Sequence, residues 1–129
     1  MNVFTTHGAF SWNELTTTDP AAAAQFYGEL FGWNVKQTDA EMGGYRVVAI
    51  GETGVGGIMA SPAGAPPMPP RWGCYVTVDN LDAALARCAT LGGKTLVPAM
   101  EVPTVGRMAV IQDPQGAALS VMEYLPTQG

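Results

Sequence analysis

Glu14 lies two positions after Trp12, and a carboxylate next to a large aromatic side chain could act in acid–base catalysis. Residues 9–16 are predicted to form a β-strand, in which side chains two positions apart point from the same face. A carboxylate that a large aromatic ring shields from water holds a proton more readily, which suits it to general acid–base catalysis. The structural alternative is that Glu14 pairs with an arginine or accepts hydrogen bonds from backbone N–H groups. Glu14 is therefore the candidate catalytic residue.

Hydroxyl and aromatic side chains could line a binding site for a small molecule. Thr16 shares the predicted face of Trp12, and Tyr75 and Ser120 belong to two later predicted strands. A pocket with aromatic walls and hydroxyl groups suits a planar or aromatic compound. The alternative is that the aromatic rings fill the space themselves, so that Trp12 plugs a cavity instead of lining it.

Arg107 and His7 are further candidates. A guanidinium group can hold a substrate carboxylate or phosphate through two hydrogen bonds, and Arg107 lies in a predicted strand over residues 105–112. The alternatives are that Arg107 pairs with Glu14 or points to solvent. The single histidine of the chain, His7, could shuttle a proton, but a histidine without a second partner is more often structural.

The helix that follows the first strand has clear boundaries. Asp19 is a good N-cap residue, and Pro20 at the first helical position loses no hydrogen bond. An apolar stripe then continues to Phe31, and Gly32 is placed to end the helix.

The remaining elements repeat this scheme. A second helix is predicted from the cap Asn80, 61 positions after Asp19 (19 to 80), to the glycines at 92 and 93. Gly56 and Gly57 indicate a bulge or a close approach by another backbone or a ligand. Strands are predicted over residues 9–16, 33–37, 45–50, 55–60, 72–79, 94–97, 105–112 and 117–124.

The pattern predicts one domain over residues 1–129, built from two βαβββ modules. Module one covers about 8–60 and module two about 72–125, joined by a proline-rich linker at 61–71. Each helix covers one sheet face, so the other faces must pack together or enclose a cavity. We expect an α+β fold in which the modules pair into a curved eight-stranded mixed sheet with a cavity and with the helices outside.

Composition excludes several classes of protein. The net charge is −5 and the six Lys and Arg residues are scattered, so neither nucleic acid nor an anionic membrane is an expected partner. No apolar run is long enough to span a bilayer, and the first residues lack the features of a signal peptide. Two cysteines and seven methionines suit a reducing compartment, which predicts a cytoplasmic protein.

Three segments resemble the vicinal oxygen chelate superfamily, which includes glyoxalase I, extradiol dioxygenases and bleomycin-resistance proteins. The segments are DPAAAAQFYGELFGW, YVTVDNLDAALARCATLGG and VGRMAVIQDPQGAALSVMEY. The lead-in HGAFSWNEL is similar to a glyoxalase-like subgroup related to lactoylglutathione lyase. This resemblance covers nearly the whole chain, but the superfamily hosts metal enzymes, metal-free enzymes and binding proteins.

The resemblance also places the metal ligands of the superfamily on particular residues. The positions fall on Trp12, Gly73, Ser120 and one residue within 57–59, none of which is His, Asp or Glu. A transition metal needs three or four nitrogen, oxygen or sulfur donors. We therefore expect neither a metal site nor another cofactor.

The resemblance and the absence of metal-ligating residues at these positions together predict a metal-independent domain that handles a small organic molecule in a cavity between the modules. If it is an enzyme, we expect a lyase or isomerase in which Glu14 moves a proton and Arg107 or hydroxyl groups stabilise an enolate. One alternative is a non-catalytic protein that sequesters a ligand, as bleomycin-resistance proteins do. Another is a dimerising domain with a filled cavity. The resemblance favours a homodimer.

Overall fold

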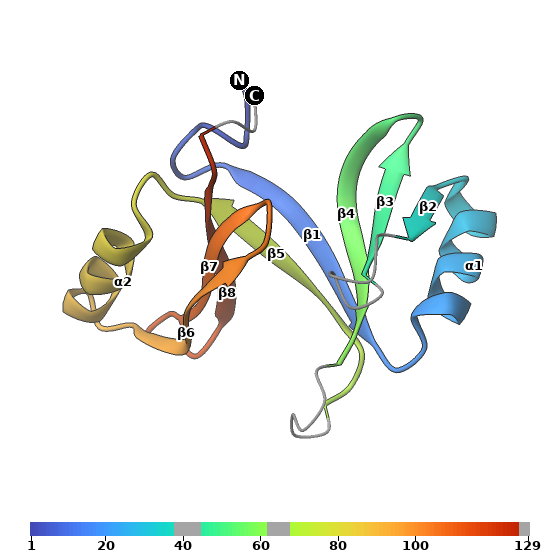
Figure 1. Ribbon diagram of the computed structural model, residues 1–129. Coiled ribbons are helices and arrows are strands. Elements are labelled where there is room, and N and C mark those ends of the chain that lie inside the picture. Colours follow the sequence, from blue (N-terminus) through green and yellow to red (C-terminus); the bar gives the residue numbers. More distant parts are fainter. Residues whose placement is uncertain (38–44, 62–67, 127–129) are drawn as a thin grey trace. The chain divides into compact units, whose positions relative to one another are not determined.

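The computed structural model describes residues 1–37, 45–61 and 68–126 of the chain. Over these ranges the element series βαβββ occurs twice, as predicted (Figure 1). Hydrogen bonds order the strands as β2-β3-β4-β1-β5-β8-β7-β6 in a mixed sheet, which confirms the α+β class. The elements are β1 (Phe10–Thr17), α1 (Pro20–Phe31), β2 (Asn34–Gln37), β3 (Arg46–Ile50), β4 (Thr53–Ala60), β5 (Arg71–Thr77), α2 (Leu81–Thr90), β6 (Lys94–Val102), β7 (Gly106–Gln112) and β8 (Ala118–Tyr124).

Both helices begin with the cap that the sequence predicts. The Asp19 side chain accepts a hydrogen bond from the Ala22 N–H at 3.0 Å, and the Asn80 side chain accepts one from the Ala83 N–H at 3.0 Å. Gly32 ends α1 in the left-handed conformation, with φ of 75°. The 61-residue offset therefore repeats the same chemistry at both helix starts.

Contacts divide the chain into two compact units. One unit is Trp12–Gly73, and the other combines Met1–Ser11 with Cys74–Gly129. The chain passes from one unit to the other inside β1 and again inside β5. The module borders given above differ from these borders and stay a prediction.

In the Trp12–Gly73 unit, α1 packs on one face of a four-stranded arrangement (Figure 1). β1 runs parallel to β4, while β4 with β3 and β3 with β2 are antiparallel. The buried core under α1 consists of Leu15, Val48 and Ile58. Since alternate residues of a strand face opposite sides, Glu14 and Gly57 lie on the face away from α1.

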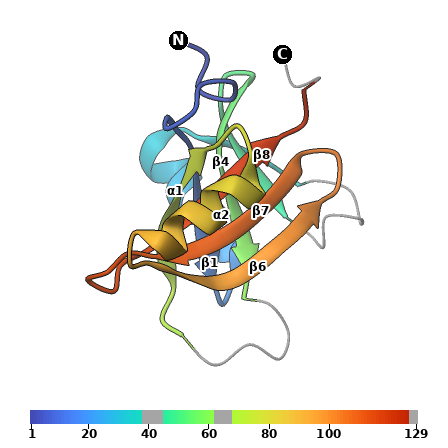
Figure 2. The same cartoon turned by 90° about the vertical axis from the view of Figure 1, so that its left-hand side faces the viewer.

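In the other unit, α2 lies against β6, β7 and β8 (Figure 2). β5 is parallel to β8, and β8, β7 and β6 form an antiparallel series. The core beneath α2 contains Val78, Leu81, Ala109 and Val121. Neither helix of the described ranges has the length and apolar character that crossing a bilayer requires.

The strand predicted over residues 94–97 is too short, because β6 continues to Val102. Pro98 lies inside it, and the pairing with β7 shifts register between Thr95 and Val97 and again between Val97 and Met100. β6 is the last strand in the sheet order, and an edge strand tolerates a proline that cannot donate to the ladder. Residues 62–67 of the predicted linker lie outside the described residues.

Candidate functional site

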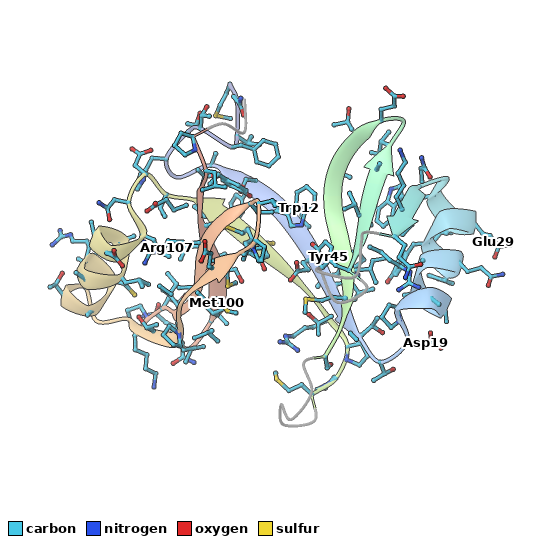
Figure 3. The ribbon with its side chains drawn as sticks, in the orientation of Figure 1. Trp12, Asp19, Glu29, Tyr45, Met100 and Arg107 are labelled. Carbon is cyan, nitrogen blue, oxygen red and sulfur yellow. The ribbon has the colours of Figure 1, made fainter. Side chains whose placement is uncertain are left out.

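The phenol of Tyr45, the residue before β3, joins Trp12 to Glu14. Trp12 and Tyr45 are labelled in Figure 3. The indole N–H of Trp12 donates to the Tyr45 hydroxyl at 2.9 Å. That hydroxyl donates to Oε2 of Glu14 at 2.7 Å. All three side chains are half-buried. They form a directed series of hydrogen bonds, here called the Trp12–Tyr45–Glu14 network.

Gly57 makes room for this network. It is the register partner of Glu14 in β4 and is buried. A Cβ atom built on Gly57 would overlap the hydroxyl and ring of Tyr45. The glycine doublet predicts a bulge or a close approach by another backbone or a ligand; at Gly57 the close neighbour is instead the Tyr45 side chain. Sequence reasoning missed Tyr45, although Gly57 was the signal that could have pointed to a close neighbour.

The network defines what Glu14 can do chemically. A phenol that donates to a carboxylate stabilises its ionised form and fixes its orientation. An ionised and oriented carboxylate is the form that accepts a proton from a substrate. The Trp12 N–H in turn occupies a lone pair of the Tyr45 oxygen, so the phenol proton is directed toward Glu14.

Thr16 lies on the same face of β1 as Trp12 and Glu14. Its register partner in β4 is Met59, and it is half-buried. Three of the six predicted site residues thus share one strand face in the Trp12–Gly73 unit.

Tyr75 and Ser120 lie together in the other unit. They are register partners in the parallel pair of β5 and β8. Tyr75 is 7% exposed and Ser120 is half-buried. Their side chains therefore start from one register position and share a face of the sheet.

Arg107 faces α2. Its Nη2 lies 3.0 Å from Oδ1 of Asp82, and its Nη1 donates to Oδ2 at 3.4 Å. This hydrogen bond and the charge of Asp82 raise the pKa of the Arg107 guanidinium. Arg107 is the register partner of Glu123, whereas Ser120 is the partner of Val110, so Arg107 and Ser120 lie on opposite faces of the sheet. The expected pairing with a carboxylate is present, but with Asp82 instead of Glu14.

His7 has a structural contact. Its Nδ1 accepts a hydrogen bond from the backbone N–H of Asp79 at 3.1 Å. This bond ties the N-terminal segment to the residue before the Asn80 cap, in line with the structural alternative for a lone histidine.

The strand register settles which residue of 57–59 matches Ser120. Gly57 is opposite Glu14 as Ser120 is opposite Tyr75. The four ligand positions of the resemblance therefore hold a tryptophan, two glycines and a serine. Within the described ranges, no three His, Cys, Asp or Glu side chains are grouped as a metal ion would require. This donor set does not fit a transition metal.

Curated relatives match most of the chain. It is 39% identical over 122 residues to the Mycobacterium bovis protein named "Putative glyoxylase CFP32", covering 94% of this chain and 46% of that protein. It is 35% identical over 127 residues to "Anthracycline biosynthesis protein DnrV" of Streptomyces peucetius, covering 88% of this chain and 46% of the relative. The chain thus spans about half the length of the curated relatives it matches.

Solved structures share the fold. The methylmalonyl-CoA epimerase of Mycobacterium tuberculosis has a TM-score of 0.67 at 17% identity, over 92% of this chain and 89% of that chain. The hypothetical protein BH1468 of Bacillus halodurans has a TM-score of 0.72 at 10% identity, over 96% and 99%. Identities this low show the fold alone.

The family comparison agrees with the element order and with the relatives. The family model described as "Glyoxalase/Bleomycin resistance protein/Dioxygenase superfamily" matches residues 9–121. This range contains both βαβββ series up to the middle of β8. The chain belongs to the glyoxalase/bleomycin resistance protein/dioxygenase superfamily.

Proposed function

We propose that this chain is a metal-independent, glyoxalase-like domain that acts on a small carbonyl compound, with Glu14 as the general base of an isomerase or lyase reaction. The observation that carries the proposal is the Trp12–Tyr45–Glu14 network, because it fixes the orientation of a carboxylate that can accept a proton. The names of two similar proteins agree with the proposal: one relative is named "Putative glyoxylase CFP32", and one protein of the same fold is a methylmalonyl-CoA epimerase.

The first step is proton abstraction from a carbon next to a carbonyl group. Glu14 takes the proton, and the electron pair of the broken C–H bond moves onto the carbonyl oxygen to give an enolate. A hydrogen-bond donor near that oxygen lowers the barrier. The Thr16 hydroxyl is on the face of Glu14, whereas Arg107 is held by Asp82. Return of the proton to a carbon of the enolate completes an isomerisation without net gain or loss of atoms.

Exchange of a carbon-bound proton for deuterium tests this role directly. The protein is incubated in D₂O with methylmalonyl-CoA, and then with a panel of small thioesters and α-hydroxy ketones, while NMR follows loss of the α-proton signal. We expect E14Q to exchange about 100-fold more slowly or worse, the usual range for general acid–base catalysis. The matched control is E29Q, which changes an exposed carboxylate of α1 (Figure 3). Exchange by E14Q at the rate of the unsubstituted protein would disprove the proposal, as would no catalysed exchange with any compound.

Metal independence has its own test. Protein dialysed against EDTA should keep its full exchange rate, and metal analysis should find no stoichiometric metal. An exchange rate that depends on added zinc, nickel or iron would contradict this part of the proposal and leave the role of Glu14 standing.

A second candidate is a non-catalytic domain that binds a small molecule. The observation that favours it is that the Trp12 indole N–H and the Tyr45 hydroxyl are already hydrogen-bonded inside the protein. Binding would appear as an increased melting temperature with a ligand, without proton exchange. Melting temperatures that stay flat across diverse aromatic compounds would argue against it.

A homodimer is also part of the proposal. It is supported by the relatives, which are about twice as long as the stretch that matches this chain. Sedimentation should then give twice the 13.5 kDa mass of one chain. A single species with the mass of one chain at high concentration would rule the homodimer out.

A further inference from the structure

The Trp12–Gly73 unit contains a pocket on the face that α1 covers, opposite the face of Glu14. Its volume is about 330 Å³. Asn13 lines the pocket and is the residue before Glu14 in β1. Because neighbouring side chains of a strand point to opposite faces, the pocket lies on the face opposite Glu14. The lining residues are Asn13, Trp33, Val48, Val55, Gly56 and Trp72.

Two of the lining residues are tryptophans. The ring centroids of Trp33 and Trp72 are 6.1 Å apart, and the planes are 80° to each other. Tyr27 packs against both rings: its ring centroid is 5.6 Å from that of Trp33 and 5.4 Å from that of Trp72. Trp72 is nonetheless 42% exposed, so a large aromatic surface remains open to solvent. Covering such a surface is favourable for an apolar ligand.

Gly56 lines the pocket without contributing a side chain. A Cβ atom on Gly56 would lie 2.6 Å from the backbone oxygen of Asn13, which is too close for any side chain. The close pairing of β1 and β4 therefore excludes a larger residue at this point.

The polar groups of the pocket are few. The Trp72 N–H donates to the Tyr27 hydroxyl at 3.2 Å, so this indole is already satisfied. The Asn13 amide has no hydrogen-bond partner among the residues that the structure describes. It offers a ligand both a donor and an acceptor. None of the six lining residues carries a charge.

We propose that this pocket binds an uncharged, planar aromatic molecule of one or two fused rings that carries one hydrogen-bonding group. The indole rings and valines contact the flat faces and edges of the ligand, and Asn13 contacts its polar group. The volume lies at the small end of ligand sites, which limits the size of the ring system. This site is separate from Glu14 and does not rest on the proposed catalysis.

The test uses the indole N–H signals of ¹⁵N-labelled protein. The chain has three tryptophans, so each signal can be assigned with the variants W12F, W33F and W72F. Titration with 2-naphthol, a planar two-ring alcohol, should shift the signals of Trp33 and Trp72 saturably and that of Trp12 much less. The matched control is decalin-2-ol, which has the same rings without planarity or aromatic character and should give no saturable shift.

Variants locate the contacts. N13A should weaken 2-naphthol binding about two- to tenfold, the range for one lost hydrogen bond. W72A should weaken it more than tenfold, and W72F, which keeps a ring, should retain most of it if W72A fails to fold. E14Q should bind as the unsubstituted protein does, so a failure here is distinguishable from a failure of the proposed catalysis.

Four outcomes would overturn the proposal. One is a shift of the Trp12 signal alone, and a second is no saturable shift up to the solubility limit of 2-naphthol. A third is tighter binding of tetramethylammonium at the same signals, which would make the site a cation–π site. A fourth is a shift of Trp33 and Trp72 on raising protein concentration without ligand, because a second copy would then cover the pocket.

Discussion

The phenol of Tyr45 occupies the space in which any residue other than glycine at position 57 would place its Cβ atom. From this position its hydroxyl contacts both Trp12, at 2.9 Å, and Glu14, at 2.7 Å. A glycine in β4 thus determines where a carboxylate in β1 is held. The relationship is steric, and it makes the network sensitive to a single methyl group.

G57A should therefore displace Tyr45 and destabilise the protein by about 1–3 kcal/mol, the usual cost of overpacking a buried site. Urea unfolding measures this cost. The matched control is G73A, whose Cβ would have the Glu14 backbone oxygen as its nearest neighbour, at 4.0 Å. In the double variant G57A/Y45A the two costs should be less than additive, since the clash is gone. Strictly additive costs would show that Tyr45 does not occupy this space.

Y45F keeps the ring and removes the hydroxyl that joins Trp12 to Glu14. Two half-buried polar groups then lose a partner, and we expect a loss of about 1–2 kcal/mol in the free energy of unfolding. The indole N–H signal of Trp12 should shift at the same time. Y27F is the matched control, because it removes another phenol that accepts from an indole, that of Trp72. An unchanged Trp12 signal in Y45F would contradict the hydrogen bond.

R107Q should leave deuterium exchange within about twofold of the unsubstituted protein. The Arg107 side chain is 39% exposed and that of its partner Asp82 is 72% exposed. Solvent therefore screens their ion pair, which contributes little to the stability of the fold. D82N, which releases Arg107 from the pair, should also have a small effect. A large loss of exchange in R107Q together with normal exchange in D82N would return Arg107 to the substrate-binding role.

Tyr124 should make the protein sensitive to alkali. Burial raises the pKa of its phenol, and the hydrogen bond shared with Ser11 at 2.8 Å opposes that rise. Above the ordinary value of 10.0 the native state therefore holds a proton that the unfolded state has lost. The free energy of unfolding must then fall as pH rises through this range, since the native state binds more protons.

The fall of the free energy of unfolding with rising pH should be shallower in Y124F. It should be steeper in S11A, because that variant removes the hydrogen bond that opposes the rise of the Tyr124 pKa. Urea unfolding at several pH values above about 9 measures both slopes. Equal slopes in Y124F and the unsubstituted protein would assign the decline to other groups.

Local chemistry made much of the fold predictable. Asp19, Asn80 and Gly32 act within a few residues of their own helix, so their roles can be inferred from neighbouring sequence. The common face of Trp12 and Glu14 also follows from strand periodicity alone.

The site required information that no local pattern holds. Tyr45 meets Glu14 only because β3 and β1 both flank β4, and strand order is a property of the whole sheet. Strand alternation predicts that Arg107 lies on one of two sheet faces, but it does not say which face α2 covers. The ion pair with Asp82 of α2 shows that Arg107 lies on the face that α2 covers. β6 continues past Pro98 because an edge strand can lack a donor, and edge position is again set by the sheet.

The chain passes between its two compact units inside β1 and again inside β5, and this limits how the protein could be cut into fragments. A cut within residues 61–71 separates the two βαβββ series, yet it leaves Met1–Ser11 on the first fragment while the rest of that unit is on the second. The bonds from the Gly8 N–H to the Thr77 oxygen, at 2.8 Å, and from the Thr77 N–H to the Ala9 oxygen, at 2.9 Å, would then join separate polypeptides. Such fragments would have to associate to regain these bonds, so the repeated βαβββ series and the compact units are different stretches of this chain.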